Sequence, residues 1–247
     1  MVFFVTPFWT LQAPPICGWY RLRMADGLTQ LIDRLVANCE QVKLLQPPLV
    51  RAGLWIVFSG GFVLVATLSH GTRSGMTDHF ARPDVMLPFV GALLTGVLAT
   101  VATFYVSLPG RPRGWRLLPL PALMLWLASL GWGILSDWKR LGSAGLAVSQ
   151  SFHCFQAILI TSLALGSILL LLVRHARLGH PRTTALLSSL STSALASAGV
   201  TLVHDLDTAL MVLIWHVGTV GLLTLASWLG GDRLFSWIEG TPERRPS

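Results

Sequence analysis

The chain contains six long apolar runs separated by short polar linkers. Each run is roughly 17 to 25 residues long, and about 20 apolar residues are needed for a helix to cross a bilayer. We expect the six spanning helices at 52–69, 86–107, 117–136, 154–173, 184–203 and 208–229. The pattern predicts an all-α polytopic membrane protein whose six-helix transmembrane bundle occupies residues 52–230.

Residues 25–45 follow a different pattern, in which apolar residues recur at three- and four-residue spacing with charged residues between them. The apolar positions are Leu28, Leu31, Ile32, Leu35, Cys39 and Val42. This period is typical of an amphipathic helix, and Gln46-Pro47-Pro48 is expected to end it. Such a helix can lie on the membrane surface, or it can offer its apolar face to a groove on a cytoplasmic partner.

Residues 1–23 are interpreted as an extension from an upstream start codon, because Met24 opens a sequence that looks like a natural start. The extension has no basic segment, and prolines interrupt its apolar stretch, so it does not resemble a signal peptide. We expect this extension to be disordered. The segment 24–51 would then be the N-terminal segment of the protein, and residues 231–247 would be its tail.

The distribution of charge predicts the orientation of the bundle. The protein is 53% hydrophobic, only 12% of its residues are charged, and its net charge is +7. Fourteen of the 18 Lys and Arg residues lie in residues 1–51, the second and fourth linkers and the tail, on one side of the predicted membrane. The positive-inside rule places that side, with both termini, in the cytoplasm. Because topology explains the positive charge, we expect membrane lipid as a partner and no direct binding of nucleic acid.

A histidine and a cysteine, His153 and Cys154, lie side by side at the start of the fourth run. The other polar residues expected on the same outer face include Asp137, His204 and Asp207. Thiolate and imidazole bind zinc and similar soft or borderline metals, and an imidazolium makes a neighbouring thiol more reactive. The outer face is therefore a candidate for metal capture, with Cys154, His153 and His204 as ligands, or for thiol chemistry. Alternatively, the cysteine is a small buried residue and the histidine a polar anchor.

The fifth and sixth runs carry polar residues within their apolar lengths. His216 lies inside the sixth run, where an ionisable residue usually faces the bundle interior and a partner. We expect either a hydrogen bond to a serine or carbonyl of a neighbouring helix, or a part in an outer-face site or polar path. Ser189, Ser193 and Ser197 recur every four residues in the fifth run. Small residues at this spacing let helices approach closely, which favours a packing face over a catalytic serine.

The sequence carries no signature of an enzyme. A phosphate-binding loop, a paired intramembrane aspartate and a two-histidine metalloprotease helix are all missing from it. Its three cysteines do not read as a disulfide framework. We therefore expect neither catalysis nor a resident cofactor, and at most transient binding of a metal ion. A small transporter for a metal ion or solute is the alternative function, and a scaffold without sensing chemistry is a third.

Several motifs, in order along the chain, resemble the NrsF-type (OsrA-like) family of membrane anti-sigma factors. They are LQPPLVRAGLWI at 45–56, SLPGRPRGWRLLPLPALMLWLASLGWG at 107–133, SDW at 136–138, SFHCF at 151–155 and LIWHVG at 213–218. The resemblance extends over most of the chain after Met24. Its most specific parts are the long 107–133 run and the HCF triplet.

The resemblance implies a six-span protein of the bacterial inner membrane that holds an extracytoplasmic-function sigma factor inactive. The cytoplasmic N-terminal segment would bind the sigma factor, and a periplasmic signal such as a metal ion or an oxidant would release it. The expected docking residues are Leu28, Leu31, Ile32, Leu35, Val42, Pro47 and Pro48.

Members of this family are similar in having two periplasm-facing cysteines implicated in sensing. One corresponds to Cys154, and the second would fall between the fifth and sixth runs, where this chain has HDLD and His204. The departure argues against an intramolecular disulfide switch and leaves a mixed Cys/His metal site or a thiol that pairs between chains. Signal sensing is expected at Cys154, with His153, His204, Asp207 and Asp137 nearby.

Overall fold

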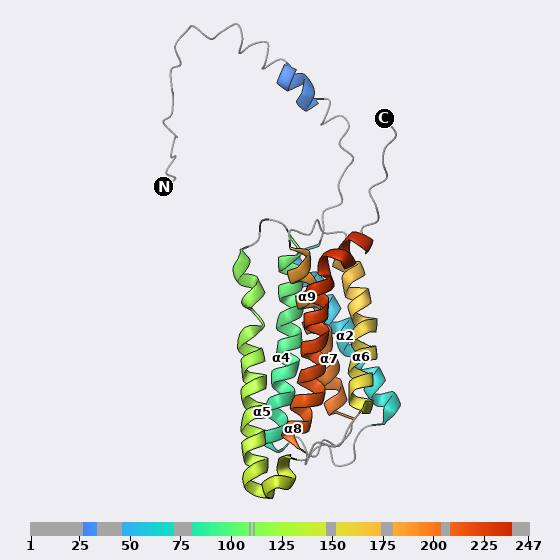
Figure 1. The fold of residues 1–247 in the computed structure, drawn as a ribbon. Coiled ribbons are helices and arrows are strands. Elements are labelled where there is room, and N and C mark those ends of the chain that lie inside the picture. The colour runs from blue at the N-terminus through green and yellow to red at the C-terminus, as the bar shows by residue number, and fades with distance from the viewer. Residues whose placement is uncertain are drawn as a thin grey trace, which may run out of the picture. The chain divides into compact units, whose positions relative to one another are not determined.

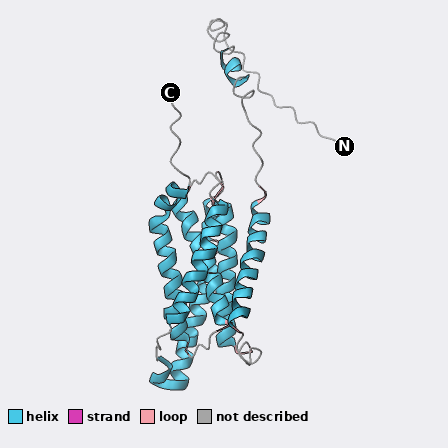
Figure 2. Ribbon diagram, turned by 90° about the vertical axis from the view of Figure 1, so that its right-hand side faces the viewer, coloured by secondary structure: helices cyan, strands magenta, loops and turns pink. Residues whose placement is uncertain are grey.

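The structure is a computed structural model of the chain. It describes residues 27–33, 46–71, 81–108, 110, 112–146, 152–173, 180–203 and 208–238. These residues belong to two compact units, one within Met1–Leu45 and one within Gln46–Ser247. Helices are the regular elements of both units, and the described ranges contain no strand (Figure 2).

In the first unit, a short helix covers residues 27–33. Leu28, Leu31 and Ile32 are 60%, 54% and 50% exposed. Their spacing places all three on one face of the helix. The remainder of the predicted amphipathic helix, with Leu35 and Val42, lies outside the described residues.

In the second unit, helices occupy all six segments that were expected to span the membrane. They are α2 (Pro48–His70), α4 (Pro83–Val106), α5 (Leu120–Leu141), α6 (Phe152–Val173), α7 (Pro181–Thr201) and a last segment. That last segment consists of α8 (Ala209–Val212), the π-helical η4 (Leu213–Val217) and α9 (Gly218–Ile238). The 3₁₀ helices η2 (Arg113–Leu117) and η3 (Gly142–Leu146) flank α5.

Successive helices run antiparallel, so α2 begins at the same end of the bundle at which α9 ends (Figure 1). We call this end the terminal end. At the opposite end, called the distal end, α5 ends and α6 begins.

Proline begins three of the helices, with Pro48, Pro83 and Pro181 in their first turns. The first N–H groups of a helix have no intrahelical acceptor, and the fixed φ of proline suits this position. Consequently α2 begins at Pro48, four residues before the expected start of the first span. Pro47 and Pro48 thus lie at the start of a long helix. The sequence predicted only that they end the preceding amphipathic helix, and the end of that helix lies outside the described residues.

The last helix is longer than the sequence predicted, because α9 continues to Ile238 instead of ending near residue 229. Arg182 Nε donates a hydrogen bond of 2.6 Å to Asp232 Oδ2, which joins the start of α7 to the end of α9. A Cβ built on Gly231 would lie 2.8 Å from Arg182 Cα. This close contact between helices extends α9 into the segment expected to be a tail.

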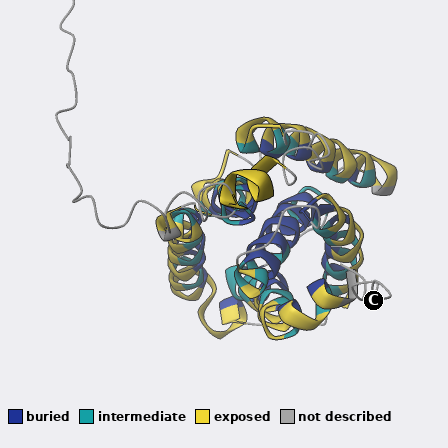
Figure 3. Cartoon of the chain, turned by 90° about the horizontal axis from the view of Figure 1, so that it is seen from above, coloured by how far each residue is buried: buried dark blue, intermediate teal, exposed yellow. Residues whose placement is uncertain are grey.

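Helix α7 lies at the centre of the bundle. Every residue from 191 to 200 is buried, and α7 packs most extensively against α4 and α9. A Cβ built on Gly96 of α4 would lie 2.7 Å from Leu195 Cγ of α7. The absence of a side chain at Gly96 therefore allows the close approach of α4 to α7. Seen along the bundle, buried positions line the inside and exposed positions the outside (Figure 3).

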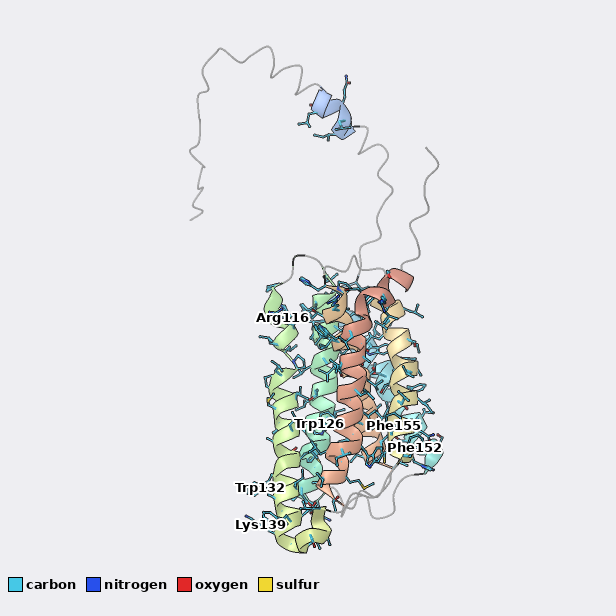
Figure 4. All side chains as sticks on the ribbon, viewed as in Figure 1. Arg116, Trp126, Trp132, Lys139, Phe152 and Phe155 are labelled. Atoms are coloured by element: carbon cyan, nitrogen blue, oxygen red, sulfur yellow. The ribbon has the colours of Figure 1, made fainter. Side chains whose placement is uncertain are left out.

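The outer surface of the bundle is apolar. Trp132 of α5 is 68% exposed, whereas Trp126, six residues earlier, is buried against the neighbouring helices (Figure 4). Five helical segments, all except α7, are long and apolar enough to cross a membrane. The chain is therefore a multi-pass membrane protein by length and composition, and the crossing by α7 stays a prediction.

Candidate functional site

A cavity of ≈ 200 Å³ lies at the distal end of the bundle, between α4, α5, α7 and the start of the last helical segment. We call it the distal cavity. Arg82, Asp84 and Asp137 contribute charged groups to its lining, His216 contributes an imidazole, and Trp126 is part of its apolar wall. The distal cavity is large enough for a few water molecules or a small ligand.

Asp137 connects α5 to the last helical segment. Its carboxylate is buried and accepts two hydrogen bonds, from Arg140 Nη2 to Oδ1 at 2.9 Å and from the backbone N–H of Ala209 to Oδ2 at 2.9 Å. The second bond satisfies a first-turn N–H group of α8, which has no acceptor within its own helix. Asp137 therefore holds the start of the last span against the end of α5.

His216 connects the last helical segment to α7. Its side chain is fully buried, and Nδ1 lies 2.9 Å from Ser197 Oγ. This contact matches one of the two roles expected for His216, a hydrogen bond to a serine of a neighbouring helix. Ser197 belongs to the serine series predicted to form a packing face, so that face also supplies a partner for the imidazole.

The residues around His216 form a π-helical turn, η4 (Leu213–Val217). Such turns are rare, occur mostly as single turns inside α-helices, and are frequent at functional sites. In η4 the neighbouring residues Trp215 and His216 face different surroundings. His216 lines the distal cavity, while Trp215 packs against a cluster that contains Cys154.

Arg82 and Asp84 form an ion pair at the start of α4. Arg82 Nε lies 3.3 Å from Asp84 Oδ1. The hydrogen bond and the charge of Asp84 raise the pKa of the Arg82 guanidinium, against the opposing effect of partial burial. The expected second span began at residue 86, after Asp84, whereas the structure places Asp84 in the first turn of α4. Each carboxylate that lines the cavity has an arginine partner, Asp84 with Arg82 and Asp137 with Arg140.

Cys154 and His153 lie on different sides of α6. Cys154 is fully buried and packs with Ile158 of α6 and with Ala196 and Val200 of α7. His153 is exposed. Phe152 and Phe155 stand in contact beside them, with ring centroids 5.6 Å apart (Figure 4). The structure thus does not bring the thiol and the neighbouring imidazole to a common point, and the thiol has the small buried setting that the sequence left as an alternative.

The expected sensing residues, which include the expected metal ligands Cys154, His153 and His204, are only partly within the described residues. His204 and Asp207 lie outside them, and Asp137 faces the distal cavity while Cys154 does not. Within the part of the chain that the structure describes, no three His, Cys, Asp or Glu side chains form a group that could hold a metal ion.

Arg82 and Thr208 are among the residues lining the distal cavity that were not singled out from the sequence as site residues. Arg82 lies in the linker between the first two expected spans, and Thr208 is the first residue of the expected last span. Thr208 Oγ1 accepts a hydrogen bond of 3.3 Å from the backbone N–H of Met211 and caps the start of α8. A threonine just before an apolar run is a capping signal that could have identified it.

Comparison with known families identifies one family model that covers the helical bundle. A family model described as NrsF, negative regulator of sigma F, matches residues 35–237. No curated protein and no solved structure matches the chain significantly. The matched range contains α4 to α8, which line the distal cavity, and extends over α2 and most of α9.

Proposed function

The chain belongs to the NrsF family of negative regulators of sigma F, and we propose that it is an inner-membrane anti-sigma factor for an extracytoplasmic-function sigma factor. A negative regulator of a sigma factor acts by binding and needs no catalytic group. The observation that carries the proposal is the family match over a bundle of membrane-capable helices.

The N-terminal segment 24–51 is the proposed docking site for the sigma factor. Leu28, Leu31 and Ile32 expose their side chains on one helical face, which is the arrangement by which an amphipathic helix enters a hydrophobic groove. Pro47 and Pro48 join this segment to α2. The excess of Lys and Arg on this side of the predicted membrane supports a cytoplasmic location for both termini.

The distal end is the proposed sensor and would face the periplasm. A buried thiol is poorly accessible, so a metal ion or an oxidant reaches Cys154 only if the packing of α6 against α7 and Trp215 opens. Trp215 is adjacent to His216, so this opening also moves a wall of the distal cavity. His153, His204, Asp207 and Asp137 are the polar groups proposed to assist at Cys154.

A signal at the distal end must favour one of two arrangements of the bundle if it is to alter sigma-factor binding. The contacts Ser197–His216 and Asp137–Ala209 hold the last span against α7 and α5. We infer that opening around Cys154 weakens these contacts and changes how the N-terminal segment is presented.

Co-purification from membranes tests the two halves of the proposal separately. The intact protein should retain a sigma factor, and Leu31→Asp should lose it, while Gln30→Asp on the opposite face of the same helix should retain it. If both variants retain the sigma factor, docking through this helix is contradicted.

The sensor half is tested by adding a metal ion or an oxidant to the same preparations. The intact protein should release the sigma factor, and Cys154→Ser should keep it bound under the same treatment. A Cys154→Ser variant that responds normally would contradict sensing at this thiol. If no sigma factor is recovered under any condition, transport of a metal ion or solute in reconstituted vesicles becomes the function to measure.

A further inference from the structure

A second hollow lies near the terminal end of the bundle, between α2, α4 and α6. Its volume is ≈ 360 Å³, which is within the range of about 300 to 1,000 Å³ usual for small-molecule sites. We call it the terminal groove; its lining includes Gln46, Arg51, Leu54, Phe58, Phe104 and Leu172. Leu54 and Phe58 are 62% and 48% exposed, so the groove has a wall on the outer surface of the bundle.

Arg51 brings a positive charge to this apolar groove. Its Nη2 donates a hydrogen bond of 2.7 Å to the backbone carbonyl of Leu172, and its guanidinium carbon lies 5.1 Å from the centroid of the Phe104 ring. A guanidinium has five N–H donors, and this carbonyl uses one of them. Among the described residues, no carboxylate forms an ion pair with Arg51. Neutral groups therefore position the guanidinium, and its positive charge can pair with an anionic ligand.

The groove is charged near the membrane surface and apolar further in. Arg51 follows the start of α2 by three residues, which is about 5 Å along the helix, and Phe58 lies about 10 Å deeper. An arginine at this depth keeps its head group near the interface. A ligand that matches both ends has an anionic head at the interface and an apolar chain directed into the bilayer.

We propose that the terminal groove binds an anionic phospholipid, with the phosphate on the Arg51 guanidinium and an acyl chain along Leu54 and Phe58. Charge complementarity favours this occupant, because the terminal end carries exposed arginines such as Arg116 and attracts anionic lipid of that leaflet. The proposal goes beyond regulation of a sigma factor and requires only that the bundle lies in a membrane.

The position of the groove gives the lipid a structural consequence. Gln46, the first residue of the bundle unit, lines the groove and lies within the N-terminal segment 24–51, directly after residue 45. A bound phospholipid therefore contacts the point at which the N-terminal segment joins α2. The lipid bound in the terminal groove can therefore be changed experimentally while the residues of the distal end stay the same.

Native mass spectrometry of the full-length protein in detergent tests the site. Phosphatidylglycerol and phosphatidylcholine with identical acyl chains are added in turn, and the lipid-bound fraction is measured. The intact protein should bind one phosphatidylglycerol more tightly than phosphatidylcholine. Arg51→Gln should weaken phosphatidylglycerol binding about fivefold, the effect of one interfacial cation. Arg116→Gln, which removes an exposed charge outside the groove, is the matched control and should change it less.

Two further variants keep the result interpretable if Arg51→Gln does not fold. Arg51→Lys keeps the charge and should keep most of the preference for phosphatidylglycerol. Leu54→Trp keeps Arg51 but places a larger side chain on the exposed wall, and it should weaken binding of both lipids. Equal losses for Arg51→Gln and Arg116→Gln, or unchanged binding in Leu54→Trp, would overturn the proposal.

Discussion

Helices α6 and α7 are neighbours of similar length with opposite relations between composition and burial. The window of α6 that could cross a membrane is the most apolar of the five, yet only 28% of it is buried. Helix α7 is too polar to count as a crossing helix by the same measure, yet residues 191–200 are buried without exception. In this bundle, apolarity therefore marks contact with lipid and small polar residues mark the centre.

The physical reason is that lipid is as apolar as a leucine side chain, so the hydrophobic effect does not drive helices together within the membrane. Association depends on close packing and on hydrogen bonds that satisfy polar groups internally. Thr100 of α4 lies 2.6 Å from Ser191 Oγ of α7 and also donates to the carbonyl of Gly96 at 2.9 Å. Small hydroxyl side chains thus allow both close approach and satisfied hydrogen bonds.

The largest expected effect on stability comes from adding a side chain where α4 and α7 approach each other closely. In Gly96→Leu, the new Cβ would lie 2.7 Å from Leu195 Cγ and 3.2 Å from the Leu195 backbone nitrogen. We expect the free energy of unfolding to fall by about 3 kcal/mol, the upper part of the usual cost of overpacking. Thermal unfolding in detergent micelles measures the change.

The matched control for this prediction is Gly60→Leu on α2, where a new Cβ would meet no described atom within 4 Å. Loss of a helical glycine should leave stability unchanged or raise it by up to about 1 kcal/mol. Equal destabilisation by the two substitutions would mean that α7 is not the closely packed centre.

A somewhat smaller effect is expected within α6, where buried and lipid-facing isoleucines lie two residues apart. Ile158 is fully buried beside Cys154, and Ile160 is 66% exposed. Ile158→Ala should cost about 2 kcal/mol, because the cavity that it leaves loses packing contacts. Ile160→Ala should change unfolding by less than about 0.5 kcal/mol, and a comparable loss would show that its face also packs on protein.

The two aspartates that join helices at opposite ends give the next contrast. Asp137→Asn removes the ion pair with Arg140 at a buried carboxylate, and we expect a loss of about 1 to 2 kcal/mol. Asp232→Asn removes an exposed ion pair with Arg182 and should cost at most about 1 kcal/mol. Unfolding at low and high salt distinguishes them, since only the exposed pair is strongly screened. A loss at Asp137 that depends on salt as strongly as the loss at Asp232 would contradict its buried placement.

The smallest effect concerns hydroxyl groups of α7. Ser197→Ala removes the contact with His216, and a hydrogen bond between membrane helices contributes on average about 0.6 kcal/mol. Ser193 donates to the carbonyl of Ser189 in its own helix at 2.6 Å, so Ser193→Ala should cost less. In a His216→Phe background, Ser197→Ala should lose most of its effect. An unchanged effect there would show that the pair is not coupled.

The positions of the helices followed from the apolar runs, while several of their ends did not. α9 passes its expected end because Arg182 and Gly231 of different helices meet there. For the site, His216 and a serine partner were expected in general terms. The choice of Ser197 depends on how α7 and η4 are rotated relative to each other, which a single helix does not reveal.

By itself, the sequence determined the helical class, the apolar segments, the exposed apolar face of 27–33 and the family of the chain. Local spacing and hydropathy are sufficient for the first three, because each depends on residues close together in the chain, whereas the family follows from motifs that extend along most of the chain. The tertiary structure alone decided that Cys154 is buried, that Asp137 holds Ala209, and that Arg51 heads an apolar groove. These features depend on which helices pack together and how each is rotated, because their partners come from separate helices of the folded bundle.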